Sequence, residues 1–231
     1  MFELVIRLVR RTEVDVGFNM SWIFVDGIDE DALYGALDLA ATDETPDPHD
    51  LGTSYVPLAG AALKSGGCAV FARYALVMDA TVGTNPARLT WLPARSRCIT
   101  CVVLEHAMVS YASLWQDGRY AWQIRHASSQ GGGHLEVRGD LPSAFGDFRN
   151  IAMDKQRAQQ ARSKPGEWGV NYFFDVPLDT AAAITGYRHD RAVESDFFRN
   201  LRTLVPTNGN VLTKLSQPPG WWQTLRSIEY E

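Results

Sequence analysis

The chain has 231 residues, of which 45% are hydrophobic and 21% are charged, an ordinary composition for a globular protein. Its formal net charge of -5 argues against a general nucleic-acid binder, because such proteins usually carry a basic face. Three cysteines do not suggest a disulfide framework, and no run approaches the roughly 18 apolar residues of a membrane helix, so we expect a cytoplasmic protein with no membrane partner.

Residues 1–19 are either an extra strand or an extension upstream of the domain, because a clean strand pattern opens at Met20. We predict that 20–231 form a single domain whose first strand covers 20–26. Asp26 or Asp29 can cap the helix that follows. The apolar positions of that helix recur at helical spacing, at Ala32, Leu33, Ala36, Leu37 and Ala40.

Acidic residues are concentrated between Asp26 and Asp50, where the chain has nine of them and no lysine or arginine. One interpretation is a solvated helix face followed by a polar loop. The other is an anionic surface that binds a basic partner, since complementary charge speeds association and sets specificity. The candidate contact residues in this segment are Asp29, Glu30, Asp31, Asp43 and Glu44.

The middle of the chain predicts an antiparallel meander. Residues 66–80, 87–93 and 98–105 are strand candidates, and Asp117-Gly118 is a hairpin turn that joins 108–115 to the strand in 118–128. Alternation in that last strand places Tyr120, Trp122, Ile124 and His126 on one face. A further strand is expected at Leu135 to Arg138.

The second half predicts helices that cover this sheet, so the fold class is α+β. Residues 141–164 form a helix with Phe145, Phe148 and Ala152 on its packed side. We expect a short strand over 170–176, a helix from Pro177 to a stop at Gly186, and an irregular tail from about residue 191.

The Cys98-x-x-Cys101 pair has the letters of a metal or redox motif, but strand geometry opposes that interpretation. If 98–105 is a strand, the two cysteines face opposite ways and cannot grip one metal ion. Redox pairs normally sit at a helix start, which this β-branched run does not suggest. We therefore predict a core strand, no metal site and no cofactor.

Glu105 and His106 stand where this apolar run stops, and they are the first place to look for a site. A buried glutamate needs a partner, so structural pairing is one reading and a functional carboxylate in a cleft is the other. His126 could lie near them if its strand is a neighbour.

The glycine-rich stretches lack the features of a phosphate-binding loop, and residues 187–190 suggest a polar loop tied by Arg–Asp pairing. Trp221 and Trp222 are either a packing anchor of the tail or an exposed pair that binds a partner.

The stretches "VVLEHAMVSYASLWQDGRYAWQIRH" and "DVPLDTAAAITGYRHD", together with the one that begins at Met20, resemble a family of uncharacterised bacterial proteins over roughly residues 20–190. Some members of that family look similar to immunity proteins of bacterial toxin systems. That family has no assigned enzymatic activity, and the resemblance transfers no functional residue to this chain.

These observations favour a bacterial, non-enzymatic protein that binds another protein, with the immunity partner of a secreted toxin as the specific expectation. The first alternative is a small-molecule enzyme or binder that uses Glu105, His106 and His126 in a cleft. The second is a purely structural domain.

Overall fold

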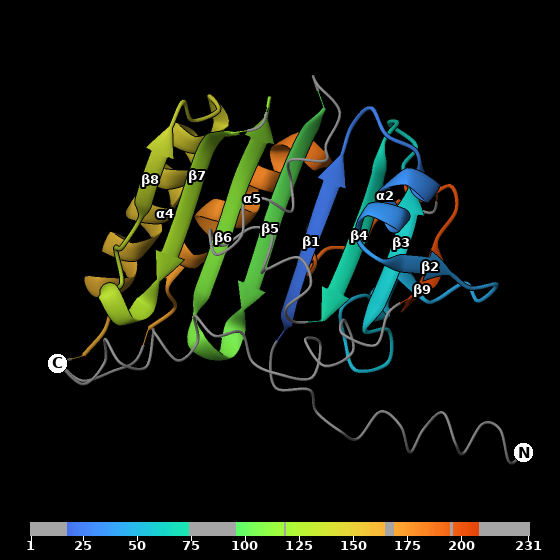
Figure 1. The fold of residues 1–231 in the computed structure, drawn as a ribbon. Helices are drawn as coiled ribbons and strands as arrows, with labels where there is room; N and C mark the ends of the chain where they lie inside the picture. The colour runs from blue at the N-terminus through green and yellow to red at the C-terminus, as the bar shows by residue number, and fades with distance from the viewer. Residues whose placement is uncertain (1–17, 74–95, 118, 165–168, 195, 208–231) are drawn as a thin grey trace, which may run out of the picture.

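The computed structural model describes residues 18–73, 96–117, 119–164, 169–194 and 196–207. Nine strands in these ranges form one sheet in the order β2-β9-β3-β4-β1-β5-β6-β7-β8, and every neighbouring pair is antiparallel (Figure 1). The strands are β1 (Asn19–Val25), β2 (Leu39–Ala41), β3 (Leu58–Ala62), β4 (Cys68–Arg73), β5 (Arg97–Leu104), β6 (Val109–Gln116), β7 (Arg119–Ala127), β8 (Glu136–Gly139) and β9 (Arg202–Pro206). The α+β class is thus established.

One face of the sheet is covered by two helices, α4 (Ala144–Gln160) and α5 (Asp175–Thr185), which lie behind the strands in Figure 1. Trp22, Ile99, Cys101 and Ile124 point from the strands into the main apolar core on this side. The helices and the chain after α5 complete that core with Phe145, Ala152, Leu178, Ala181, Tyr187 and Leu201.

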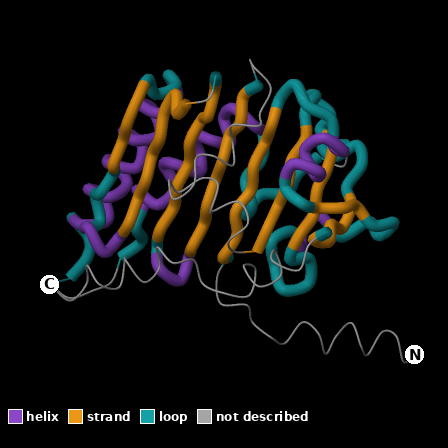
Figure 2. The backbone as a smooth tube through the Cα atoms, viewed as in Figure 1, coloured by secondary structure: helices purple, strands orange, loops and turns teal. Residues whose placement is uncertain are grey.

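The opposite face carries α2 (Glu30–Ala36) at the end of the sheet that contains β3 and β4, as Figure 2 shows. Leu33 and Tyr34 of this helix pack with Ile23, Val70 and Cys98 in a second apolar cluster. Asp29 caps the helix, because its Oδ1 accepts a hydrogen bond from the Ala32 N–H at 2.8 Å. The prediction of Asp29 as a possible cap is confirmed, although the helix ends at Ala36 and Ala40 belongs to β2.

The meander from β5 to β8 agrees with the sequence prediction. Asp117, at the hairpin turn, adopts φ 51°, the left-handed conformation that a tight hairpin turn requires. Cys98 and Cys101 face opposite sides of β5, one in each apolar cluster, as strand geometry predicted.

One prediction about β7 is wrong: Tyr120 does not share a face with Trp122. The register between β6 and β7 shifts at Leu114/Trp115, so that Trp115 pairs with Tyr120 and Leu114 with Trp122. Such a bulge reverses the side on which the next residue points. Tyr120 therefore packs edge-on against Trp115 on the α2 side, with ring centroids 4.6 Å apart.

The expected strand over 170–176 is also wrong. Tyr172–Phe174 form a single 3-10 turn, η5, that leads directly into α5, and the side chain of Asn171 accepts a hydrogen bond from the Phe173 N–H at 3.2 Å. The apolar residues of η5 pack as the first turn of a helix because Asn171 supplies the capping group. α5 then runs to Gly186, whose φ of 76° ends it as predicted.

The tail that was expected to be irregular from about residue 191 contains β9, which lies between β2 and β3. β3 itself had no counterpart among the predicted strands. Asn19 begins β1, whereas 1–17 and the strand candidate at 87–93 lie outside the described residues. None of the helices within the described ranges is long and apolar enough to cross a membrane.

Alanine substitutions at two glycines test how the helices pack on the two faces of the sheet. A Cβ at Gly60 of β3 would overlap the phenol of Tyr34, whereas a Cβ at Gly146 of α4 would meet nothing within 4 Å. We expect Gly60→Ala to lower the free energy of unfolding by about 1–3 kcal/mol, because Tyr34 has to shift. Gly146→Ala should raise it by up to about 1 kcal/mol, because alanine favours the helix. Urea denaturation of both variants measures this, and equal effects would contradict the packing of α2 on β3.

Candidate functional site

Glu105 begins the 3-10 turn η3 (Glu105–Ala107), which follows β5 directly. Its Oε2 accepts a hydrogen bond from the Phe18 N–H at 2.8 Å, and its Oε1 lies 3.3 Å from Nε2 of His189. The hydrogen bond from His189 and the Phe18 N–H outweigh burial and hold the pKa of Glu105 below its ordinary value. The expectation that Glu105 needs a partner is therefore met by His189.

His189 lies among aromatic rings beneath the sheet. Its side chain is 1% exposed, and its ring centroid is 4.9 Å from that of Phe18 and 5.9 Å from that of Trp22. With Nε2 turned to the carboxylate, the other ring nitrogen, Nδ1, has no hydrogen-bond partner in the described structure. The Glu105–His189 hydrogen bond therefore ties the end of β5 to the chain after α5.

Arg188, the residue before His189, is a nearly buried cation surrounded by carboxylates. Its guanidinium donates to Asp175 at 2.5 Å, to Asp179 at 2.6 Å and to Asp190 at 2.7 Å, and its side chain is 7% exposed. Asp179 also accepts from Arg191 at 2.7 Å. The sequence prediction that 187–190 are tied by Arg–Asp pairing is confirmed. We call Arg188 and its three aspartates the Arg188 cluster.

The electrostatics of the Arg188 cluster favour the charged forms. Burial lowers the pKa of Arg188, but its hydrogen bonds to Asp190 and Asp179 and the charges of Asp175 and Asp179 outweigh that effect and raise the pKa above its ordinary value. Burial likewise raises the pKa of Asp190, and the bond from Arg188 reverses this, so the pKa of that carboxyl lies below its usual range. The cluster fixes the backbone from Tyr187 to Arg191 against α5.

Of the three predicted catalytic candidates, Glu105 and His106 are adjacent at the end of β5 and contact Phe18 and Asn19. His126, on β7, donates from Nδ1 to the His134 carbonyl at 2.7 Å and accepts at Nε2 from the Asn171 amide at 3.0 Å. Burial lowers its pKa, as expected for a neutral ring with both nitrogens occupied. His106 instead places Nδ1 2.5 Å from Oδ1 of Asn19. His126 thus connects β7 to η5, and a shared role with Glu105 and His106 stays a prediction.

The three cysteines are buried, and burial raises the thiol pKa of Cys68 to about 11 and of Cys98 to about 12. No group of three or more histidine, cysteine, aspartate or glutamate side chains within the described ranges could hold a metal ion. These thiols pack as small apolar groups, since a neutral buried thiol is a poor nucleophile and a poor ligand.

Residues 26–50, the acidic segment, lie along α2, β2 and the loop that contains the 3-10 turn η1 (Pro48–Asp50). Two of the five predicted contact residues have structural roles: Asp29 caps α2, and Glu30 accepts from the Tyr34 hydroxyl and from the Asn200 amide, each at 3.2 Å. Asp31, Asp43 and Glu44 are exposed, and their carboxylates make no hydrogen bond or ion pair with other described residues. Trp221 and Trp222 lie outside the described residues.

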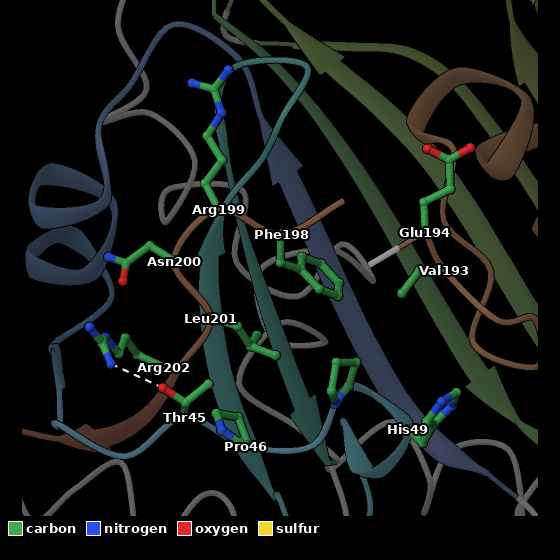
Figure 3. Close-up of a pocket in the computed structure, with 11 residues that line it drawn as sticks. Thr45, Pro46, His49, Val193, Glu194, Phe198, Arg199, Asn200, Leu201 and Arg202 are labelled. Atoms are coloured by element: carbon green, nitrogen blue, oxygen red, sulfur yellow. Dashed lines mark hydrogen bonds between the residues drawn. The ribbon is translucent and has the colours of Figure 1, made fainter. Parts of the chain in front are cut away.

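A cavity of about 520 Å³ opens beside the loop of the acidic segment (Figure 3). Thr45, Pro46, Pro48 and His49 form one wall, and residues 193–194 and 198–202 form the other. A smaller cavity of about 290 Å³ shares Pro48, His49 and Val193 with it and extends to Tyr187 and His189. Neither cavity could be predicted from the sequence, because their walls come from segments that are about 150 residues apart in the chain.

Comparison with known proteins found no matching family model, no matching curated protein and no matching solved structure. The resemblance to a bacterial family therefore remains a prediction.

Arg188→Met tests the Arg188 cluster. Removing the guanidinium leaves three neighbouring carboxylates without their buried cation, so we expect the free energy of unfolding to fall by roughly 3–5 kcal/mol. Arg138→Met is the matched control, because Arg138 is exposed and its pair with Glu136 should contribute less than about 1 kcal/mol. Equal losses in urea denaturation at pH 7 would show that the cluster does not stabilise the fold.

Glu105→Gln tests the pair with His189 through its pH dependence. Because the pKa of Glu105 is lower in the folded protein than its ordinary 4.5, the carboxylate stabilises the fold above about pH 4.5, and this stabilisation is lost as the pH falls through the folded-state pKa. Native protein should therefore be more stable than Glu105→Gln at pH 7, and the difference should shrink below pH 4.5. A difference that stays constant from pH 7 to pH 3 would argue against the ionic form of the pair.

Proposed function

We propose that the protein works by binding a basic segment of another protein through the acidic segment. The observation that carries this proposal is the imbalance of charge: nine carboxylates lie between Asp26 and Asp50. Among the described residues, only Asp26 has a cation within 4 Å, namely Arg97 at 3.9 Å. Carboxylates that are left exposed and unpaired create a negative potential that attracts a basic partner and orients it.

We restrict the proposed contact residues to those without a partner among the described residues of the protein. Asp31, on α2, and Asp43 and Glu44, after β2, are exposed. Asp29 and Glu30 already have partners within the protein, so their substitution would alter α2 as well as the surface charge. A toxin that displays a lysine- or arginine-rich segment is the partner that the family resemblance suggests, and its neutralisation by this surface is the specific form of the proposal.

The alternative of a small-molecule enzyme has less geometric support. It needs Glu105, His106 and His126 in one cleft. Glu105 and His106 contact Phe18 and Asn19 at the start of β1, whereas His126 is held by His134 and Asn171. Binding through the acidic segment needs no rearrangement of the described structure.

A triple charge reversal tests the proposal. We expect Asp31→Lys/Asp43→Lys/Glu44→Lys to weaken binding of a 20-residue oligolysine at least tenfold, measured by calorimetric titration at low salt, because three attractive carboxylates become repulsive. The matched control is Asp140→Lys/Asp147→Lys/Asp154→Lys, which changes the net charge equally at exposed positions near and on α4.

If the two triple variants lose affinity equally, binding follows the net charge of the whole protein, and the acidic segment is not the docking surface. If neither variant loses affinity, no electrostatic docking occurs at either place. A thermal melt of each variant verifies that α2 and α4 remain folded.

A further inference from the structure

The 520 Å³ cavity and the acidic segment share one loop. Residues 45–49 line the cavity, while Asp43, Glu44 and Asp47 of the same loop are exposed beside it. Any segment attracted by these carboxylates arrives at the mouth of the cavity. The position of the cavity therefore makes it part of the surface proposed above to bind the partner.

The floor of the cavity is apolar, whereas its rim also carries polar and charged side chains, namely Thr45, His49, Glu194, Arg199, Asn200 and Arg202. Figure 3 shows Phe198, Leu201 and Val193 around its centre, with Pro46 on the opposite wall. Leu201 is 7% exposed and belongs to the main core, and Phe198 and Val193 pack against that core. The floor is thus a continuation of the core that meets solvent, and covering it with an apolar group is favourable.

Three of the polar side chains at the rim of the cavity each donate a hydrogen bond to another residue of the protein. Arg202 donates to Oγ1 of Thr45 at 3.0 Å, and Arg199 donates to the Lys64 carbonyl at 3.1 Å. In Figure 3 the guanidinium of Arg199 points away from the centre of the cavity. Asn200 donates to the carboxylate of Glu30. An apolar side chain on the floor of the cavity leaves these bonds intact.

The size of the cavity suits one large side chain with part of its backbone. Its volume lies within the ~300–1,000 Å³ range of protein ligand sites. Aromatic side chains that enter such pockets, ringed by charged residues, contribute most of the affinity of many protein interfaces.

We infer that this cavity is an anchor pocket for a large apolar or aromatic side chain carried on the basic segment of the protein partner. The inference rests on the proposed function and specifies the partner: a stretch with lysine or arginine residues on both sides of one bulky apolar residue. The basic residues meet Asp43, Glu44 and Asp47, and the apolar residue enters between Pro46 and Leu201.

Two synthetic peptides test the inference, Lys-Lys-Gly-Trp-Gly-Lys-Lys and the same peptide with alanine in place of tryptophan. Titration of each into the full-length protein, followed by NMR chemical shifts, gives the two affinities. We expect the tryptophan peptide to bind about tenfold more tightly, because it buries an aromatic side chain that the alanine peptide lacks. The largest shifts should come from Val193, Leu201 and their neighbours.

Val193→Trp, which fills the cavity from its own wall, should remove the advantage of the tryptophan peptide while leaving the alanine peptide unaffected. Val170→Trp is the matched control, because Val170 is 59% exposed and lies outside the cavity, and it should keep the tenfold difference. Thermal melts verify the fold of both variants.

The outcomes separate the two proposals. If both peptides bind native protein equally and the reversal at Asp31, Asp43 and Glu44 weakens both, the acidic surface stands and the anchor pocket is overturned. If the tryptophan peptide keeps its advantage in Val193→Trp, the aromatic side chain binds elsewhere, and the pocket is again overturned. If the triple reversal changes neither affinity, the proposed function fails, and the inference fails with it.

Discussion

A buried guanidinium determines the course of the chain beneath the sheet. Arg188 is held by two aspartates of α5 and by Asp190, and it thereby fixes the residues on either side of it. Tyr187 enters the aromatic core, with its ring 5.0 Å from that of Phe71, and His189 reaches Glu105 at the end of β5. A buried cation without such partners would be costly, so the three carboxylates and this backbone path require one another. From this fixed point the chain continues along 193–202, one wall of the anchor pocket, and into β9.

The carboxylates of the protein are of two kinds: some are paired with arginines inside the protein, and others are exposed to solvent. Carboxylates near α5 neutralise arginines within the protein, whereas Asp31, Asp43 and Glu44 of the acidic segment are exposed. Among the described residues, Asp26 is the one carboxylate of that segment with a cation within 4 Å. Charges of the first kind stabilise the fold, and charges of the second kind oppose it slightly through mutual repulsion, which a partner would relieve. The acidic segment thus differs from the Arg188 cluster in its pairing, and this difference is the physical basis on which we propose a binding role for the acidic segment alone.

Local patterns in the sequence were enough for much of the fold. Alternation and the Asp117 turn predicted the hairpin of β6 and β7, and Asp29 and Gly186 marked a helix start and a helix end. The pairing of Glu105 with His189, 84 residues away, leaves no local signal, because either residue alone resembles any polar residue near a strand end. β9 was missed for the same reason: its strand conformation depends on β2 and β3, which lie far from it in the chain. Tyr172–Phe174 show the opposite error. This apolar run was predicted to be a strand, but the cap at Asn171 makes it a 3-10 turn.

The most direct test of a docking surface made of the acidic segment and the anchor pocket is amide hydrogen exchange, with and without saturating Lys-Lys-Gly-Trp-Gly-Lys-Lys. Exchange reports local opening, which a bound partner slows where it covers the backbone or stabilises its hydrogen bonds. We expect slower amide exchange only within residues 43–50 and 193–202, the two stretches of chain that contain the lining residues of the cavity. Slowing over α4 and β8 with no change in those two segments would contradict this expectation.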